Sequence, residues 1–328
     1  MSLKIDLRVP VGLPVVETAA FIQRCEAAGF SGVGVHDHQH SGRDVFLTLG
    51  LAAERTSHLA LYPATSNPVT RHPMVLASLA HTLEEIAPGR TNLTLAPGFL
   101  SVGAIGHPRA SVDEMRRAVI AIRGLLAGEK VSFRGTESQL RNISDSPPSI
   151  YMTAAGPRMI ELAGEVADGV LMFVGLDPRS VTEARRHLDI GAHRVGRDLK
   201  DFAIILITPF ALDYIKGDSL LWPQRWFSPG HPWITYPSVA NLFWLEQAGI
   251  KIPLNVLPEQ VSDNDARRIC DAFGLFGSPE ESAARLQRAA EETGINHFFL
   301  FPAHTKETGY EMPERELEAF HRVLRHRL

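Results

Sequence analysis

Short apolar segments alternate with helix-like segments along almost the whole chain of 328 residues. Strand followed by helix, repeated many times, is typical of a parallel sheet that helices cover on both sides. Eight such repeats predict an α/β fold, the (β/α)8 TIM barrel, and an open doubly wound sheet is the alternative. The expected strands are Leu3–Val9, Gly32–His36, Leu59–Thr65, Thr91–Ala96, Ile150–Ala154, Gly169–Val174, Ala203–Leu212 and His297–Ala303.

Three helix starts carry clear capping signals between these strands. Ser111 and Glu114 have the spacing of a capping box, and apolar residues follow at helical intervals through Leu126. Asp177-Pro178 and Ser278-Pro279 each combine a capping residue with proline at the first helical position. These signals support the alternation of strand and helix.

Two segments interrupt the regular pattern. Residues 128–148 contain no good helix, and we expect an excursion with a short hairpin there. Residues 213–263, after the seventh strand, hold all four tryptophans and several prolines, at 223, 229, 232, 237, 253 and 258. A loop this long inside one domain is usually functional or disordered, and its aromatic content argues against disorder. We therefore expect one domain over 1–328, with 213–263 an insertion that forms a lid. A structural subdomain or a dimer contact is the alternative.

Charge, hydropathy and cysteine content argue against several classes of protein. A net charge of −4 without a Lys/Arg cluster gives no sign of nucleic-acid binding. No segment has the apolar length of a signal peptide or a membrane span. Cys25 and Cys270 lie far apart in helix-like segments, so we expect core residues, no disulfide and a cytoplasmic location.

Titratable side chains follow the second strand directly, in the sequence His36-Asp37-His38-Gln39-His40. In a barrel, active sites are built from the loops after the strands. Strand alternation places the three histidines on one side and Asp37 on the other. The segment predicts part of an active-site rim, and a polar surface turn is the alternative.

Small and polar residues follow the third, fourth and fifth strands. These turns contain Ala64-Thr65-Ser66-Asn67, Pro97-Gly98 and Thr153-Ala154-Ala155-Gly156-Pro157. Such residues allow a flat ligand to approach the backbone closely. The third turn leads into a helix with Pro157 at its start, and free N–H groups at a helix N-terminus bind phosphate well.

The segments Phe30–His38, Thr65–Pro73, Leu83–Gly98 and Ile150–Gly169 resemble the bacterial-luciferase-like superfamily. Within it they most resemble the branch with the methylene-tetrahydromethanopterin reductases and the deazaflavin-dependent glucose-6-phosphate dehydrogenases. A weaker match returns at Gly274–Leu300. The resemblance implies a (β/α)8 barrel that binds a flavin or the deazaflavin coenzyme F420 at the carboxyl ends of its strands. It also implies a homodimer.

The resemblance also implies roles for individual residues. Asp37 matches a residue that contacts the cofactor, and His38 matches a histidine near the hydride-transfer centre. Ala64-Thr65 matches the site of a cis peptide behind the ring. Further cofactor contacts are implied at Ser66, Asn67, Pro97, Gly98 and the turn Thr153, Ala154, Ala155, Gly156 and Pro157.

One position departs from the family pattern. Phe99 stands where the deazaflavin relatives commonly carry an acidic residue. The histidines are then the remaining groups that can handle protons, with His38 as the catalytic candidate.

Four functions remain open at this point. The first is F420-dependent hydride transfer to or from a C=N or C=O bond of a small molecule. The second is an FMN-dependent monooxygenase on the same scaffold. His-x-His-x-His spacing suggests the third, a metal-dependent TIM-barrel hydrolase, although no set of carboxylate and lysine partners follows later strands. The fourth is a cofactor-binding protein without catalysis.

Overall fold

Eight parallel strands form a closed barrel in the computed structural model, which describes residues 2–226, 239–254, 256–305 and 307–328. Hydrogen-bonded neighbours follow the order β3-β2-β1-β11-β9-β8-β7-β4. The bridges Leu61–Thr91 and Ser66–Leu95 join β3 to β4 and close the ring. The barrel prediction is confirmed, and the open-sheet alternative is wrong because no edge is left between the third and fourth barrel strands. The barrel strands are β1 (Lys4–Val9), β2 (Gly32–Val35), β3 (Ala60–Pro63), β4 (Asn92–Leu95), β7 (Ser149–Ala154), β8 (Gly169–Met172), β9 (Ala203–Leu212) and β11 (His297–Pro302).

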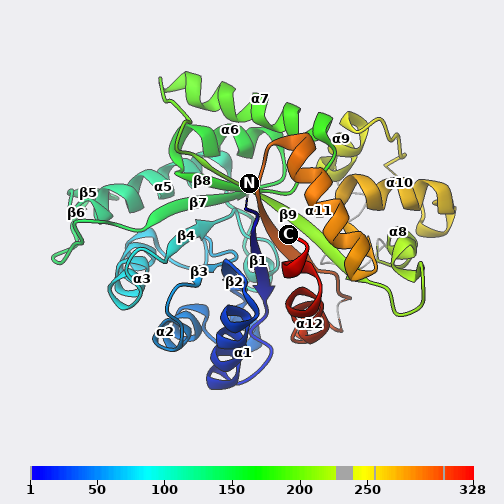
Figure 1. Ribbon diagram of the computed structural model, residues 1–328. Helices are drawn as coiled ribbons and strands as arrows, with labels where there is room; N and C mark the ends of the chain where they lie inside the picture. Colours follow the sequence, from blue (N-terminus) through cyan, green and yellow to red (C-terminus); the bar gives the residue numbers. More distant parts are fainter. Residues whose placement is uncertain (1, 227–238, 255, 306) are drawn as a thin grey trace.

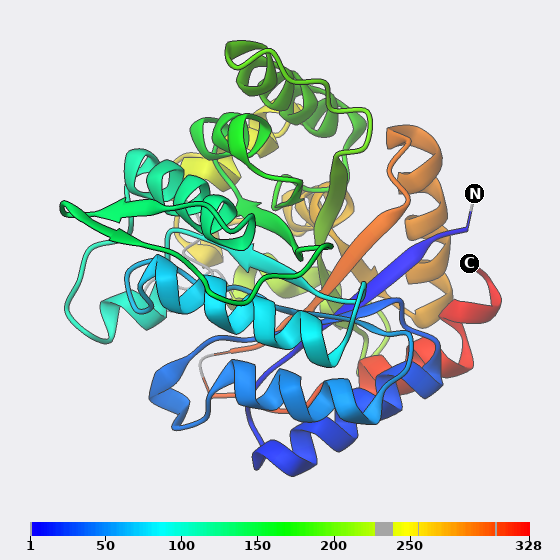
Figure 2. The same ribbon diagram turned by 90° about the vertical axis from the view of Figure 1, so that its left-hand side faces the viewer.

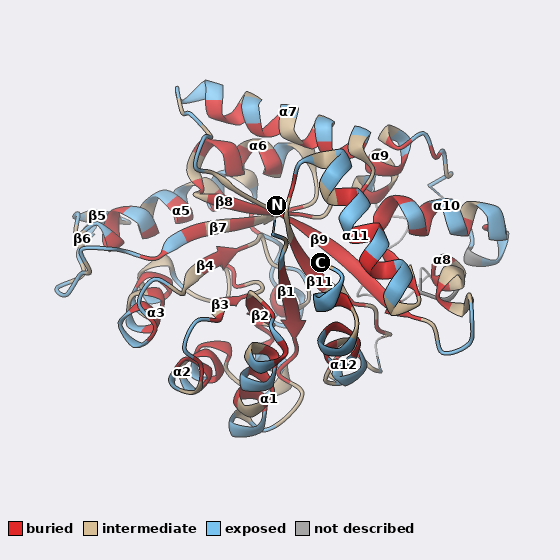
Figure 3. Cartoon of the chain, in the orientation of Figure 1, coloured by how far each residue is buried: buried red, intermediate tan, exposed pale blue. Residues whose placement is uncertain are grey.

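Helices surround the barrel, as Figure 1 shows. Each buries the side that faces the strands and exposes the other (Figure 3). The capping box at Ser111 and Glu114 and the Asp177 and Ser278 caps form as expected. The main outer helices are α1 (Val15–Ala28), α2 (Val45–Arg55), α3 (Pro73–Ile86), α5 (Val112–Leu126), α6 (Pro157–Val166), α7 (Pro178–Arg194), α11 (Pro279–Thr293) and α12 (Glu314–Arg322).

Side chains fill the barrel interior beneath the carboxyl ends of the strands. Tyr62 and Phe299 pack there with Leu171, Ile205 and Ile207. The Tyr62 hydroxyl donates to the buried carboxylate of Asp6 at 2.7 Å. Gly34 leaves the space that these rings use, because a Cβ on it would lie 2.7 Å from Phe299 and from Ala64. The interior therefore supplies a solid floor for any site above it.

The first irregular segment contains the expected hairpin. Strands β5 (Val131–Phe133) and β6 (Thr136–Ser138) pair antiparallel, and Figure 2 shows them projecting beside α5. One further short strand, β10 (Leu275–Gly277), was not expected from the sequence. It pairs parallel with the end of β9, outside the eight-strand ring.

The second irregular segment starts directly after β9. Its described elements are η2 (Asp218–Leu221), α8 (Trp222–Trp226), α9 (Val239–Gln247) and η3 (Pro258–Gln260), and α10 (Asp263–Phe273) follows. Trp222 and Trp244 are fully buried. Trp244 Nε1 donates to the Ala155 carbonyl at 2.6 Å, and Ser180 Oγ donates to the Trp244 carbonyl. Trp233 and the side chain of Trp226 lie outside the described residues.

Both cysteines are buried in helices, as expected of core residues. No helix among the described residues combines the length and the apolar character that crossing a membrane requires.

Candidate active site

A cavity of about 540 Å³ opens at the carboxyl ends of the barrel strands. Nine of the residues expected at the site line it: Asp37, His38, Ala64, Thr65, Pro97, Gly98, Thr153, Ala155 and Gly156. Four others, Ser66, Asn67, Ala154 and Pro157, are not among its lining residues. The structure thus brings together turns from four strands that are up to 120 residues apart in sequence.

Small residues form one wall of this cavity. The Ala64–Thr65 peptide is cis, as the family resemblance implies. Gly98 has a φ of +85°, a conformation that favours glycine, and a Cβ there would lie 2.2 Å from Val102. A Cβ on Gly156 would meet nothing within 4 Å and would project into open space. This wall therefore exposes backbone to a ligand at close range.

Thr153, at the end of β7, offers a hydrogen-bonding atom to this wall. Its Oγ1 is buried and has no hydrogen-bond partner among the described residues. A buried hydroxyl without a partner is costly, so a ligand group that bonds to it is favoured. Next to it, α6 begins after Gly156 with no side-chain cap. Pro157 has no N–H and the Met159 N–H bonds to the Gly156 carbonyl at 3.0 Å, so the Arg158 N–H is the group of that first turn left for an anionic ligand group.

The carboxylate of Asp37 is held by residues that follow β3. Ser66 Oγ donates to Asp37 Oδ2 at 2.7 Å, and Arg71 donates to both carboxylate oxygens at 3.1 and 3.2 Å. Arg71 also donates to Asp44, the N-cap of α2. Asp37 is only 4% exposed. This ion pair ties the loops after β2 and β3 together, a partner that the sequence analysis did not identify.

Asn67 and Ser66 shape the third turn from behind the cavity wall. Asn67 Oδ1 accepts from the backbone N–H groups of Val69 and Thr70, and its Nδ2 donates to Ser101 Oγ at 3.2 Å. Ser66 is fully buried against Asp37. Both side chains therefore have protein partners that fix the turn.

The three histidines after β2 lie in a row with tilted rings, on one side as expected, although β2 ends at Val35 and His40 already belongs to the turn η1 (Gln39–Ser41). The ring centroids of His36 and His38 lie 3.7 Å apart, and those of His38 and His40 lie 4.5 Å apart. Burial and the neighbouring His40 and Arg8 lower the pKa of His38 to about 3. At neutral pH its imidazole is therefore uncharged.

Tyr310 connects this row of histidines to the surface. Its hydroxyl lies 2.9 Å from His38 Nδ1 and 2.8 Å from His40 Nε2, and His40 is exposed. A neutral imidazole can accept a proton at one ring nitrogen and release one from the other. The chain His38–Tyr310–His40 can therefore carry a proton between the cavity and solvent.

Arg8 and His304 are site residues that the sequence analysis missed. Arg8 points from β1 into the cavity and donates to the Gly309 carbonyl at 3.1 Å. His304 follows β11, and its Nδ1 lies 2.8 Å from the Pro302 carbonyl, with its pKa lowered to about 3 by burial and by Arg8. They are brought to the site by the closure of β11 onto β1. Both are polar residues at the ends of strands. The same pattern identified the histidines after β2 and could have identified Arg8 and His304.

Phe99 lies at the rim, where the family pattern has an acid. Its side chain is 38% exposed, and the Arg109 guanidinium lies over its ring, 4.1 Å from the centroid. This cation–π pair places an apolar face and a positive charge at the mouth of the cavity.

The described ranges contain no group of three or more His, Cys, Asp or Glu side chains that could hold a metal ion. His36 and His38 instead bond to Arg8 and Tyr310. The hydrolase hypothesis therefore has no ligand set in the part of the chain that the structure describes.

A closed barrel with its cavity built from strand-end turns defines the class of protein. The chain belongs to the luciferase-like monooxygenase family, whose model matches residues 6–297. This confirms the family resemblance.

Two curated relatives illustrate the similarity. The 5,10-methylenetetrahydromethanopterin reductase of Methanolobus tindarius is 36% identical over 208 residues, which cover 61% of this chain and 63% of that protein. The F420-dependent glucose-6-phosphate dehydrogenase of Beutenbergia cavernae is 30% identical over 298 residues, covering 85% and 84%. The chain thus matches less than two thirds of the length of the reductase.

Solved structures share the fold. The coenzyme F420-dependent tetrahydromethanopterin reductase from Methanopyrus kandleri has a TM-score of 0.76 at 20% identity, with full coverage of both chains. The monooxygenase RslO1 from Streptomyces bottropensis has a TM-score of 0.64 at 19% identity and covers 99% of each chain. At these identities the similarity shows the fold alone.

Proposed function

We propose that this protein is an F420-dependent oxidoreductase that moves a hydride to or from a C=N or C=O bond of a small molecule. The observation that carries the proposal is the wall of small residues with the unpaired Thr153 hydroxyl, facing the row of histidines. The relatives, named as F420-dependent reductases and dehydrogenases, support it.

The residues present fit a flat ring with an anionic tail. The ring would lie against the Ala64–Thr65 turn and the Pro97–Gly98 turn, and its tail would meet Thr153 and the start of α6. When bound, the deazaflavin would supply the hydride chemistry. The open space beside Gly156 leaves room for that tail.

The chain's own residues would handle binding and protons. His38 would exchange a proton with the substrate atom that gains or loses it, and Tyr310 and His40 would connect His38 to solvent. Asp37 would position the loop that carries His38, through its bonds to Ser66 and Arg71.

Fluorescence titration with oxidised F420 and with FMN tests the cofactor. We expect tighter binding of F420 to the wild-type protein, and tighter binding of FMN would overturn the proposal. Thr153→Val removes only the hydroxyl and should weaken F420 binding about threefold to tenfold, the value of one neutral hydrogen bond. Thr208→Val is the matched control, because Thr208 is buried in β9 outside the cavity lining.

An FMN-dependent monooxygenase is the second candidate. Phe99 favours it, because no acid stands at the position where the F420-dependent relatives commonly carry one. The name of the family model and the monooxygenases that share the fold point the same way. FMN-dependent oxygen consumption with a reduced-flavin supply, without F420 binding, would select this candidate.

We propose that residues 213–263, of which the structure describes 213–226, 239–254 and 256–263, form a lid of a single domain that spans 1–328. Ala240, at the start of α9, lines the cavity, and Trp244 is bonded to the Ala155 carbonyl on the cavity wall. Trp244→Phe removes that bond and should loosen cofactor binding, while unchanged affinity would argue for a purely structural segment.

We propose that the protein is a cytoplasmic homodimer. Leu47 and Leu51 on α2 and Val75 and Ile86 on α3 are all more than one third exposed. A Cβ on Gly50 would lie 3.8 Å from Ile86, so the two helices form one apolar face. Light scattering should give twice the chain mass of 36.1 kDa, and Leu47→Glu should halve the measured mass. The two free, buried cysteines support the cytoplasm, which cell fractionation can test.

A further inference from the structure

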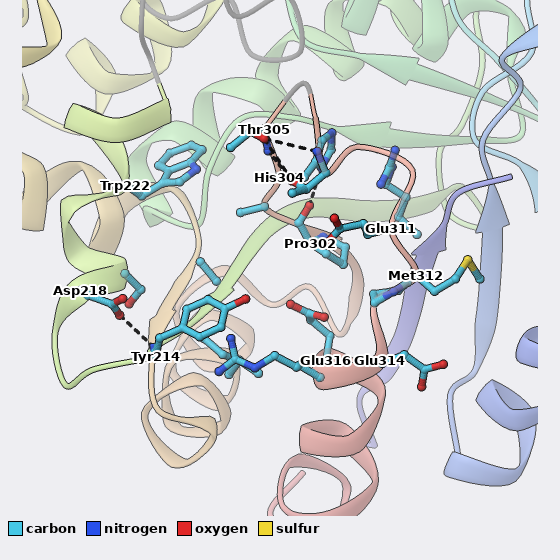
Figure 4. Close-up of a pocket in the computed structure, with 18 residues that line it drawn as sticks. Tyr214, Asp218, Trp222, Pro302, His304, Thr305, Glu311, Met312, Glu314 and Glu316 are labelled. Atoms are coloured by element: carbon cyan, nitrogen blue, oxygen red, sulfur yellow. Dashed lines mark hydrogen bonds between the residues drawn. The ribbon is translucent and has the colours of Figure 1, made fainter. Parts of the chain in front are cut away.

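A second cavity, of about 410 Å³, lies beside the first one. Arg8 and His304 line both cavities. Figure 4 shows the second cavity between Trp222 and Tyr214 on one side and His304, Thr305, Glu311 and Glu316 on the other. The shared residues make the two spaces neighbouring compartments at the end of the barrel.

Arg8 stands between the compartments as a buried cation that pairs with no carboxylate among the residues that the structure describes. Its side chain is 3% exposed, and its hydrogen bonds go to two uncharged groups, His36 Nδ1 and the Gly309 carbonyl, each at 3.1 Å. Its guanidinium lies 5.0 Å from the centre of the Phe301 ring. Arg8 Nε has no hydrogen-bond partner among the described residues.

Such a charge is unfavourable in the protein without ligand. Burial lowers the pKa of Arg8 to about 10, in the direction that favours loss of the charge. A buried arginine normally has a carboxylate or phosphate partner, because removing an ion from water is costly. The missing negative charge is therefore one that a ligand can supply.

The charges around Arg8 indicate the side on which an anion would bind. Four acidic residues line the second cavity: Asp218, Glu311, Glu314 and Glu316. Glu314 is paired with Arg24, and Arg315 lines the same cavity, so the remaining carboxylates still outnumber the positive charge there and make an anion unfavourable. Among the described residues that line the first cavity, Asp37 is the one carboxylate; Arg71 bonds to it and to Asp44, and Arg109 also lines this cavity. An anion is thus favoured on the side of Arg8 that faces the first cavity.

We propose that Arg8 is a binding site for an anionic oxygen group of a ligand in the first cavity, a carboxylate being the group that matches a guanidinium best. The neutral or cationic remainder of that ligand can extend past His304 into the second cavity. The anionic oxygen can come from the substrate or from the bound cofactor. The site goes beyond the proposed function, which assigns no role to Arg8.

Calorimetric titration with 3-phenylpropanoate and its neutral analogue 3-phenylpropanamide tests the site in the protein without cofactor. The wild-type protein should bind the carboxylate about tenfold more tightly than the amide, because one hydrogen bond between charged groups changes affinity by about that factor. Arg8→Gln keeps an N–H donor for the Gly309 carbonyl but removes the charge, so this ratio should fall to about one.

Arg43→Met is the matched control. Arg43 also donates to loop carbonyls, those of Val11 and Gly12, but lines neither cavity. This variant should keep the wild-type ratio. Arg8→Lys retains the charge and should keep part of the preference for the carboxylate over the amide. It provides a second variant if Arg8→Gln does not fold.

F420 titration of the same variants distinguishes the two sources of the anion. If the cofactor supplies it, Arg8→Gln also weakens F420 binding about tenfold, with Arg43→Met unaffected, whereas F420 binding stays unchanged if the substrate supplies it. The proposal is overturned if a folded Arg8→Gln keeps the carboxylate preference, or if it changes neither the probe ratio nor F420 binding. Failure of F420 to bind the wild type would refute the proposed function and leave the probe ratio measurable.

Discussion

The two walls of the candidate active site differ in what their side chains can do. The wall built after β3, β4 and β7 presents backbone at small residues such as Ala64, Gly98 and Gly156, with Phe99 and Arg109 at its rim. The wall built after β1, β2 and β11 is dense with titratable groups, including Arg8, His38 and His304. One wall is suited to hold a flat ring at close range, and the other to move protons and bind charge.

The difference shows how binding and chemistry can be separated within one barrel. Substitutions on the small-residue wall should alter cofactor affinity, whereas substitutions on the titratable wall should alter turnover and its dependence on pH. Asp37 belongs to both, because its carboxylate joins the loop after β2 to the loop after β3.

The largest expected effect comes from the titratable wall. His38→Ala should lower turnover about a hundredfold to ten-thousandfold, because a positioned acid–base group contributes that much. Cofactor affinity and melting temperature should change little. Steady-state kinetics, cofactor titration and thermal unfolding measure the three quantities. A folded variant with normal turnover would show that His38 is not catalytic.

Asp37, which joins the two walls, should give the second-largest effect, a loss of cofactor affinity. Asp37→Ala should weaken cofactor binding about tenfold to a hundredfold, since loss of a hydrogen bond to a charged group costs about 1.5–3 kcal/mol. Ser66→Ala removes only one of the bonds to that carboxylate and should have a smaller effect. Equal affinities for wild type and Asp37→Ala would contradict a role of Asp37 in the site.

Buried histidines should make the protein less stable in acid. The folded pKa of His304 is about 3, below its ordinary value of 6.5. As pH falls below 6.5, the unfolded chain binds a proton that the folded state excludes, so stability present at neutral pH is lost toward pH 3. One such histidine contributes about 1.4 kcal/mol per pH unit. His304→Gln should therefore show a flatter dependence of unfolding free energy on pH, and equal slopes would refute this.

The smallest expected effect concerns the path to solvent. Tyr310→Phe removes the hydroxyl between His38 and His40 and should lower turnover about tenfold, with cofactor affinity unchanged. The solvent deuterium isotope effect on turnover should rise as proton transfer becomes limiting. Tyr214→Phe is a suitable control, because Tyr214 is 79% exposed and outside the first cavity. A variant that matches this control would exclude the relay.

The fold and one wall of the site could be predicted from local sequence. Apolar runs separated by capped helices, such as the one that begins at Ser111, place the strands to within two residues of their observed ends. The small-residue turns at Ala64, Gly98 and Thr153 could be found because each is contiguous in sequence and follows a strand. Short-range sequence patterns are enough to predict those site residues that lie together in one turn.

Tertiary structure alone decided the partners across the barrel. Tyr310 reaches His38 over 272 residues, and Arg8 reaches the Gly309 carbonyl over 301. Asp37 meets Arg71, and Trp244 meets Ala155, only after separate strand–helix units pack together. No spacing or periodicity encodes these contacts, because they depend on how β11 closes onto β1 and on the register of the whole ring.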